Sequence, residues 1–195
     1  MIKDIEKLLI WHAIIIFTII LILSSISLLN AQEYKRRDFR HWIDEDHNGY
    51  DTRQEVLVEE NLSDSIVIVK VRRKYKVIKG LWICAYTGDT ITDPSKLDID
   101  HLVPLKHAYE AGAKFWTREH KKKYANFLVN KNHLVAVTAS SNRKKGAKSP
   151  AEWLPDSNVC WYIKSWLEIK GLWTLCITSE ELEKIYKIET DCNCE

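Results

Sequence analysis

The sequence predicts an α+β fold in one compact domain, because short strand patterns dominate its middle and helical patterns its second half. Residues 65–71 alternate between apolar and polar side chains, which is the period of a half-buried strand. The runs 75–78 and 82–86 have strand composition, and a turn with Gly88 closes the second. Three later segments have helical composition, the last of them amphipathic: residues 105–113, 117–128 and 158–169.

Two more strands and one helix complete the central part of the predicted fold. Residues 97–100 form a short strand pattern that leads directly into His101, and residues 134–137 are apolar enough for a buried strand. Ser140 and Ser141 then offer capping oxygens to a following helix. The expected order is therefore strand, strand, helix.

The C-terminal part is expected to add one strand and one helix. Residues 172–177 have strand composition. Ser179 is the expected N-cap of the last helix, with Glu181 or Glu183 in its first turn. No internal repeat or low-complexity tract interrupts the domain.

The proportions of hydrophobic and charged residues are those of an ordinary globular domain. The 195 residues are 46% hydrophobic and 29% charged, which excludes a disordered chain. The net charge of +2 is too small to indicate nucleic-acid binding by itself. The basic residues do cluster at positions 121–123 and 143–148, and a local patch can hold a phosphate backbone. For residues 121–123 alone, a solvated helix face is the simpler interpretation.

The N-terminal segment 1–31 has the pattern of a signal peptide or signal anchor, which leaves residues 32–195 as the domain. Lys3 and Lys7 precede an apolar run at residues 8–29, long enough to span a bilayer. Ala31 can end a cleavage site, although Leu29 is larger than such sites prefer. We expect a secreted or periplasmic protein, or one anchored to the outer face of the membrane by residues 8–29.

Five cysteines follow the apolar run, and an exported protein can pair four of them. The pairing stays open at this point. No CxxC pair is present, so a zinc knuckle is not indicated.

The polar residues at the ends of the central strands suit the chemistry of phosphodiester cleavage. That reaction needs a base for water, a divalent cation at the scissile phosphate, and cationic side chains for the strand. His101 can be the base. Asp100 and Asn142 offer hard oxygen ligands that suit Mg²⁺, with Mn²⁺ as the alternative. Two basic residues beside Asn142 suit phosphate, Arg143 and Lys145.

These residues lie in a series of fragments that resembles the exported HNH endonuclease family, which is related to the GmrSD-type HNH domain. The resemblance covers about residues 42–170. The fragments that carry it are His41-Trp42, Asp51-Thr52-Arg53-Gln54-Glu55-Val56-Leu57, Tyr86-Thr87-Gly88, Asp98-Ile99-Asp100-His101-Leu102-Val103-Pro104-Leu105, Ala108, Gly112-Ala113, Trp116, Tyr124-Ala125-Asn126, His133-Leu134-Val135-Ala136-Val137-Thr138, Asn142-Arg143-Lys144-Lys145-Gly146, Pro150-Ala151-Glu152-Trp153-Leu154-Pro155 and Cys160-Trp161-Tyr162.

The resemblance implies a ββα-metal core of the HNH (His-Me finger) type, with added helices and N-terminal strands. It implies that His101 is the general base and that Asp100 and Asn142 are metal ligands. The middle position of the HNH triad falls on Asn132 or His133, and its usual role is to orient the catalytic histidine or to join the metal shell. The chain departs from the family at Tyr50, where relatives often have a cysteine, so a disulfide that would tie that turn is absent.

A second motif precedes this core. The polar turn fits the spacing of an EF-hand calcium loop, D-x-D-x-N-G-x5-E, at Asp44, Asp46, Asn48, Gly49 and Glu55. Against a Ca²⁺ site, Asp51 takes the position where such loops want an apolar residue. The alternative interpretation is a polar turn whose Arg53 and Glu55 support the active site.

Three hypotheses for function follow from the sequence. The leading one is an exported endonuclease that cleaves DNA, with RNA as an alternative substrate. The second is a catalytically inactive, nuclease-like domain that binds nucleic acid or metal without turnover. The third is a membrane-tethered surface protein that serves an assembly. The intact set of Asp100, His101 and Asn142 favours the first.

Overall fold

The computed structural model describes residues 11–21 and 33–192. The chain forms two compact units, Met1–Tyr34 and Lys35–Glu195. Residues 11–21 are helical. Within the two described ranges, no helix is both long enough and apolar enough to cross a membrane. Most of the predicted signal segment 1–31, including its expected cleavage site, lies outside the described residues. The helices and strands described below belong to the second unit.

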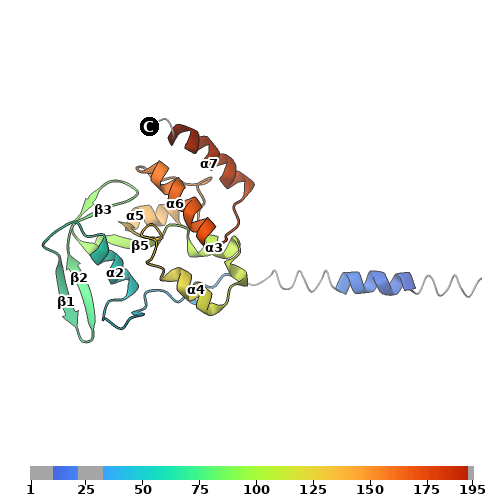
Figure 1. Ribbon diagram of the computed structural model, residues 1–195, viewed down its shortest axis with the longest axis horizontal. Helices are drawn as coiled ribbons and strands as arrows, with labels where there is room; N and C mark the ends of the chain where they lie inside the picture. The colour runs from blue at the N-terminus through green and yellow to red at the C-terminus, as the bar shows by residue number, and fades with distance from the viewer. Residues whose placement is uncertain (1–10, 22–32, 193–195) are drawn as a thin grey trace, which may run out of the picture. The chain divides into compact units, whose positions relative to one another are not determined.

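The first half of the second unit consists of one short helix and two antiparallel strand pairs. The strands of the first pair form a hairpin that stands at one edge of the unit, away from α6 and α7 (Figure 1). The strands of the second pair are only two residues long, so the predicted strand 82–86 ends early in a turn. The elements are a 3-10 turn at Arg36–Asp38, helix α2 (Thr52–Glu59), β1 (Val67–Val71), β2 (Lys74–Lys79), β3 (Trp82–Ile83) and β4 (Thr90–Ile91).

The centre of the unit is a ββα core. Strands β5 (Leu97–His101) and β6 (Leu134–Thr138) pair antiparallel, so that His101 lies opposite Leu134. Helix α5 (Ala139–Lys145) follows β6 without a connecting loop and contacts both strands. Helices α3 (Leu105–Glu110) and α4 (Arg118–Ala125) lie in the segment that connects the two strands. The predicted α+β class and its strand–strand–helix order are confirmed.

Helix α5 begins two residues earlier than a cap at Ser140 would allow. Thr138, the last residue of β6, is the N-cap, and its Oγ1 accepts a hydrogen bond from the Ser141 backbone N–H at 3.3 Å. The prediction that Ser140 or Ser141 caps the helix is therefore wrong, because the strand runs straight into the helix. Gly146, with φ of +58°, ends the helix in a conformation that favours glycine.

The C-terminal part consists of two long helices, α6 (Val159–Leu172) and α7 (Ser179–Cys192). The strand predicted at 172–177 is wrong, because α6 extends through Leu172 and the following segment folds back on the helix. Thr178, rather than Ser179, caps α7. Its Oγ1 accepts from the Glu181 N–H at 3.2 Å, and Glu181 Oε2 accepts from the Thr178 N–H at 2.8 Å. A disulfide between Cys160 and Cys192 joins the two helices.

The outer edge of β6 is covered by the end of α2. Glu60 Oε2 accepts a hydrogen bond from the Ala136 backbone N–H at 2.9 Å. Burial raises the pKa of Glu60 from 4.5 to about 7. The folded chain therefore holds this proton more tightly than the unfolded chain. The free energy of unfolding consequently falls as the pH rises from about 4.5 to about 7.

Glu60→Gln is expected to stabilise the protein at pH 8, by about 1–3 kcal/mol. The amide oxygen can still accept from Ala136, and no buried charge remains. Near pH 4.5 the gain should vanish, since Glu60 is then protonated in the folded protein. Urea unfolding at both pH values measures the difference. Glu183→Gln, at an exposed position on α7, is the control. An equal gain at both pH values would contradict the assignment.

Candidate active site

His101 ends β5 with its imidazole turned into the protein. The side chain is buried, with 4% of its surface exposed. Nε2 donates a hydrogen bond to the Ala125 carbonyl oxygen at 2.9 Å, since a carbonyl can only accept. This contact fixes the tautomer and leaves Nδ1 as the basic nitrogen. Burial is the main cause that lowers the pKa of His101 well below its usual value, with a smaller contribution from His133.

Aromatic rings pack around the His101 imidazole. The Trp42 indole is stacked with it at 5.7 Å between ring centroids, and the Tyr124 ring at 6.3 Å. The His41 ring lies edge-on at 6.5 Å. Trp42 itself has a positive φ of 57°, which is rare for a bulky residue. The segment before α2 therefore forms a cover over the catalytic candidate.

Asp100, the preceding residue, points to the opposite side of β5, toward α5. Its Oδ2 accepts two short hydrogen bonds, from the Tyr86 hydroxyl at 2.7 Å and from Lys145 Nζ at 2.6 Å. Lys145 Nζ also donates to the His101 carbonyl oxygen at 3.0 Å. The Lys145 side chain is fully buried. Its predicted role in holding phosphate does not match this position, because the ammonium group faces Asp100 and not the solvent.

Asn142 lies one turn before Lys145 on the same face of α5 and contacts a different carboxylate. Its Nδ2 donates to Asp98 Oδ2 at 3.0 Å. Asp98 and Asp100 are two residues apart on β5, so both side chains face α5. Asp98 is a residue that sequence reasoning missed, although the period of the strand places it beside Asp100.

Arg53 of α2 connects the first half of the unit to this strand. Its Nη2 donates to the carbonyl oxygens of Pro94 at 3.1 Å and Leu97 at 2.9 Å. Desolvation lowers the pKa of Arg53, and the charge of Asp98 offsets part of this effect. Arg53 thus holds the start of β5 in place next to the Asp98 carboxylate.

The two candidates for the middle position of the triad lie in different environments. The His133 ring is buried and lies 6.3 Å from the His101 ring. Its Nε2 donates to the Tyr124 carbonyl oxygen at 2.7 Å, and burial lowers its pKa to about 4. Asn132 instead accepts a hydrogen bond from Trp161 Nε1 at 3.1 Å. The structure therefore brings His133, and not Asn132, beside His101.

The donor atoms around β5 suit a hard cation. The carboxylates of Asp98 and Asp100 and the amide oxygen of Asn142 lie between β5 and α5, and oxygen ligands are those that Mg²⁺ prefers. Lys145 engages Oδ2 of Asp100, so Oδ1 would be the oxygen that faces a cation. In the described part of the chain, no three His, Cys, Asp or Glu side chains are grouped to hold a metal. The candidate donor set therefore consists of two carboxylates and the Asn142 amide.

The surface next to this site is basic. Arg143 and Lys144 are exposed on α5, and Lys148 is exposed just after the helix. Lys148 also donates to the Lys144 carbonyl oxygen at 2.9 Å. Of the two predicted phosphate contacts, Arg143 is the one that solvent and a nucleic-acid backbone can reach.

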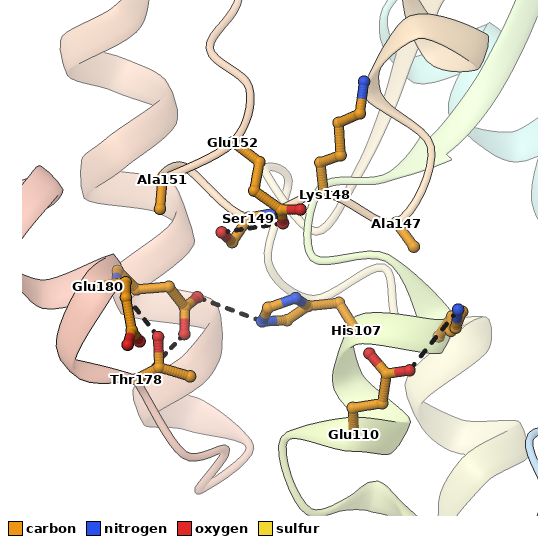
Figure 2. Close-up of a pocket in the computed structure, with 11 residues that line it drawn as sticks. His107, Glu110, Ala147, Lys148, Ser149, Ala151, Glu152, Thr178 and Glu180 are labelled. Atoms are coloured by element: carbon orange, nitrogen blue, oxygen red, sulfur yellow. Dashed lines mark hydrogen bonds and ion pairs between the residues drawn. The ribbon is translucent and has the colours of Figure 1, made fainter.

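A pocket of about 460 Å³ lies between the start of α3, the segment after α5 and the start of α7 (Figure 2). Lys106 and Lys148 bring positive charge to it, and four glutamates bring negative charge: Glu110, Glu152, Glu180 and Glu181. Glu152 is already engaged, because its Oε2 accepts from the Ser149 N–H at 3.0 Å. The pocket therefore has no net basic character, and it is not the site of the triad residues.

The sequence matches a known protein family. A family model described as the C-terminal domain of GmrSD restriction endonucleases matches residues 51–188. The chain belongs to this family. The GmrSD C-terminal match includes β5, β6 and α5, and it confirms the resemblance drawn from the sequence. It places the chain among nuclease-related domains, and it begins after the segment that covers His101.

One relative is similar over most of the chain. A protein of Arthroderma benhamiae named "Uncharacterized secreted protein" is 34% identical over 161 residues, which is 82% of this chain and 76% of the relative. No solved structure matches the chain.

Proposed function

We propose that this GmrSD C-terminal domain protein is a metal-dependent endonuclease that hydrolyses phosphodiester bonds in DNA. His101 is the general base, Asp100 and Asn142 hold the divalent metal, and Arg143 contacts the phosphate backbone. The observation that carries the proposal is the arrangement of His101. The Ala125 carbonyl fixes the tautomer, and burial favours the neutral ring, so Nδ1 is ready to take a proton from water.

The residues on the other face of β5 provide the charge stabilisation in the proposed mechanism. Asp100 and Asn142 offer oxygen ligands there. Bound Mg²⁺, or Mn²⁺, supplies charge stabilisation at the scissile phosphate and the leaving oxygen. Lys145 and Tyr86 hold Asp100 Oδ2 in a fixed orientation, so the carboxylate is preorganised. Asp100 and His101 are the last two residues of β5, so a phosphate bound at the end of this strand would lie within reach of both the metal ligand and the base.

His133 is the proposed middle residue of the triad. It does not contact the reacting atoms in this assignment. Its Nε2 fixes the Tyr124 carbonyl, and Tyr124 stacks on His101, so His133 acts as a positioning residue for the base.

The test is incubation of the purified protein with supercoiled plasmid DNA and with structured RNA. Each substrate is treated with Mg²⁺, with Mn²⁺ and with a chelator. We expect cleavage of DNA that the chelator stops and that added metal restores. Cleavage of RNA alone would change the substrate but keep the mechanism. Absence of cleavage on both substrates would favour the nuclease-like binding protein.

Asp98 is expected to position the amide of Asn142. Asp98→Leu removes the acceptor of the Asn142 Nδ2 hydrogen bond, so the amide can rotate. The affinity for Mn²⁺ and the cleavage rate should both fall by about tenfold, because a hydrogen bond to a charged group contributes about 1.5–3 kcal/mol. Asp98→Asn is the matched control, since it removes the same charge but keeps an acceptor oxygen. Equal losses in both variants, measured by calorimetric Mn²⁺ titration, would exclude a positioning role.

Export is the cellular setting that we propose for this activity. The basic start and apolar run at residues 8–29 support it, and so does the word "secreted" in the name of the relative. The same run provides the means of membrane attachment if it stays uncleaved. N-terminal sequencing of the protein recovered from a producing culture distinguishes a cleaved signal from a retained anchor.

A further inference from the structure

We propose that the hairpin of β1 and β2 is a second nucleic-acid contact of this chain, which binds the phosphate backbone of duplex DNA outside the active site. The choice of DNA as the ligand rests on the proposed function. The two strands are joined by a turn of two residues, Arg72 and Arg73. Figure 1 shows the hairpin at one edge of the unit.

The hairpin carries a high density of positive charge. Residues 67–79 contain six lysine and arginine side chains and no acidic residue. All six are exposed to solvent: Lys70, Arg72, Arg73, Lys74, Lys76 and Lys79. Among the described residues, no carboxylate forms an ion pair with any of them. Since the whole chain has a net charge of only +2, the rest of the chain is net negative, and the hairpin is a local positive surface.

The strand pairing divides the hairpin into an inner and an outer face. Residues directly opposite each other in an antiparallel pair lie on the same face. Tyr75 lies opposite Lys70, and Val77 lies opposite Ile68. Val77 is buried, so these four residues form the inner face. The outer face consists of three lysines of β2 and three valines of β1: Lys74, Lys76, Lys79, Val67, Val69 and Val71.

The polar turn before α2 packs against the inner face. The Tyr50 and Tyr75 rings are stacked with their centroids 4.7 Å apart, and the Tyr75 N–H donates to the Gly49 carbonyl oxygen at 2.8 Å. In the part of the chain that the structure describes, the carboxylates of this turn are not grouped to hold a metal. The contacts of the turn instead fix the inner face of the hairpin.

Helix α2 connects the hairpin to the active-site strand. The Val77 backbone N–H donates to Gln54 Oε1 of α2 at 2.8 Å. Arg53, beside Gln54, donates to the Leu97 carbonyl oxygen at the start of β5. Strand β2 also contacts the 3-10 turn Pro94–Lys96, which leads directly into β5. DNA held on the hairpin is therefore held at a fixed position relative to β5.

The turn of the hairpin places two more cations at its tip. Two-residue hairpin turns favour Asn-Gly or Asp-Gly, because their residues need a positive φ. Here the turn is Arg72-Arg73, and Arg72 has φ of +57°. A positive φ costs free energy at a residue other than glycine, and such exceptions cluster at functional sites. Guanidinium groups suit phosphate, so the tip extends the positive surface of the outer face.

The side chains of the outer face and the tip fit duplex DNA better than other anionic partners. A two-stranded β-ribbon can enter the major groove of B-DNA, and lysine and arginine contact its phosphates. Single strands are held by aromatic side chains on which the bases stack, and membrane surfaces favour Trp or Phe at the point of contact. The outer face and the tip have no aromatic residue. Contacts to the phosphates of a duplex are thus the ones that this surface can make.

Fluorescence anisotropy of a labelled DNA duplex measures binding to the purified full chain, with a chelator present so that metal-dependent cleavage does not occur. The variant Lys74→Gln/Lys76→Gln/Lys79→Gln removes the lysines of the outer face. Each phosphate contact contributes about 0.9 to the slope of log affinity against log salt concentration. We expect a slope shallower by about 2–3 and an affinity at low salt that is lower by at least about tenfold. Two duplexes of unrelated sequence should show the same loss, because phosphate contacts carry no sequence information.

Two control variants separate a local contact from a general loss of charge. Lys164→Gln/Lys184→Gln/Lys187→Gln removes the same charge from α6 and α7, which lie away from the hairpin (Figure 1). This variant should bind DNA nearly as well as the wild type. Lys74→Arg/Lys76→Arg/Lys79→Arg keeps the charge of the outer face and should also bind like the wild type.

The binding assay distinguishes failure of this proposal from failure of the nuclease assignment. Weaker binding by the hairpin Gln variant of a chain that does not cleave DNA would support the hairpin contact and contradict the nuclease. Wild-type affinity in that variant, or an equal loss in the α6/α7 control, would overturn the hairpin contact even if the chain cleaves DNA. The same proteins are added to phosphatidylglycerol vesicles. Loss of vesicle binding with unchanged DNA binding would assign the hairpin to a lipid surface and overturn the proposal.

Discussion

His101→Ala is expected to lower the rate of DNA cleavage by about 10²- to 10⁴-fold, the range typical of a lost general base. The variant removes the imidazole whose Nδ1 is proposed to take a proton from water. The Ala125 carbonyl loses its donor, so a modest loss of stability should accompany the change. The carboxylate of Asp100 and the amide of Asn142 stay in place on the other face.

The kinetic experiment therefore needs a metal-binding control. Single-turnover cleavage in Mg²⁺ gives the rate, and calorimetric titration of Mn²⁺ gives the metal affinity. The base assignment predicts a large loss in rate with an affinity within about threefold of wild type, less than the tenfold expected from one lost hydrogen bond. A variant that folds, binds metal and cleaves at the wild-type rate would show that His101 is not the base.

Glu181→Leu is expected to destabilise the protein by about 3–5 kcal/mol, because it leaves a buried ammonium group without its partner. Lys170 Nζ donates to both oxygens of Glu181, at 2.7 and 2.8 Å, and neither side chain has more than 1% of its surface exposed. Trp166 Nε1 donates to Oε1 at 3.1 Å, and His107 Nε2 lies 3.2 Å from the same atom. Two members of this network, Glu181 and His107, line the pocket in Figure 2.

The pH dependence of stability provides a second measure of the same network. Hydrogen bonds from His107 and Lys170 overcome desolvation and lower the pKa of Glu181 to about 2. The stabilisation is therefore present above about pH 4.5, the ordinary range of a glutamate, and is lost as the pH falls toward 2. Glu181→Leu should flatten the acid side of the stability curve.

The double variant Lys170→Met/Glu181→Leu is the decisive comparison for this network. It removes both charges, so it should recover much of the stability that Glu181→Leu loses. Glu110→Gln, which breaks the exposed pair with Lys106, is the control and should change stability by less than about 1 kcal/mol. Urea unfolding at pH 7 measures all three. A loss below 1 kcal/mol in Glu181→Leu would mean that the buried ion pair does not hold α7 in place.

The central elements of the fold could be predicted because their signals are local. Strand period and apolar content define β5 and β6, and the sequence around Asn142 indicates a helix after them. The strand predicted at 172–177 failed because its apolar residues serve helix packing. Leu175 and Trp173 are buried against the helices, and no strand pairs with this segment. Apolar composition alone does not distinguish these two environments.

Parts of the candidate site depend on tertiary contacts and could not be predicted. The sequence predicts that Lys145, three residues after Asn142, contacts phosphate. In the structure, α5 packs on β5 and buries Lys145 against Asp100. The stacking of Trp42 on His101 joins residues far apart in the chain, and no local sequence pattern predicts it. Asp98 is the exception. The two-residue period of the strand puts it beside Asp100, and that signal was available.

Plasmid cleavage by wild-type, His101→Ala and Asn142→Ala proteins, purified identically, tests the central claim most directly. Each protein is incubated with Mg²⁺, with Mn²⁺ and with a chelator. The account predicts nicked and linear products from the wild type with either metal, none with the chelator, and little or none from the two variants. Equal cleavage by all three proteins, or no cleavage by the wild type with either metal, would contradict a nuclease centre at His101 and Asn142.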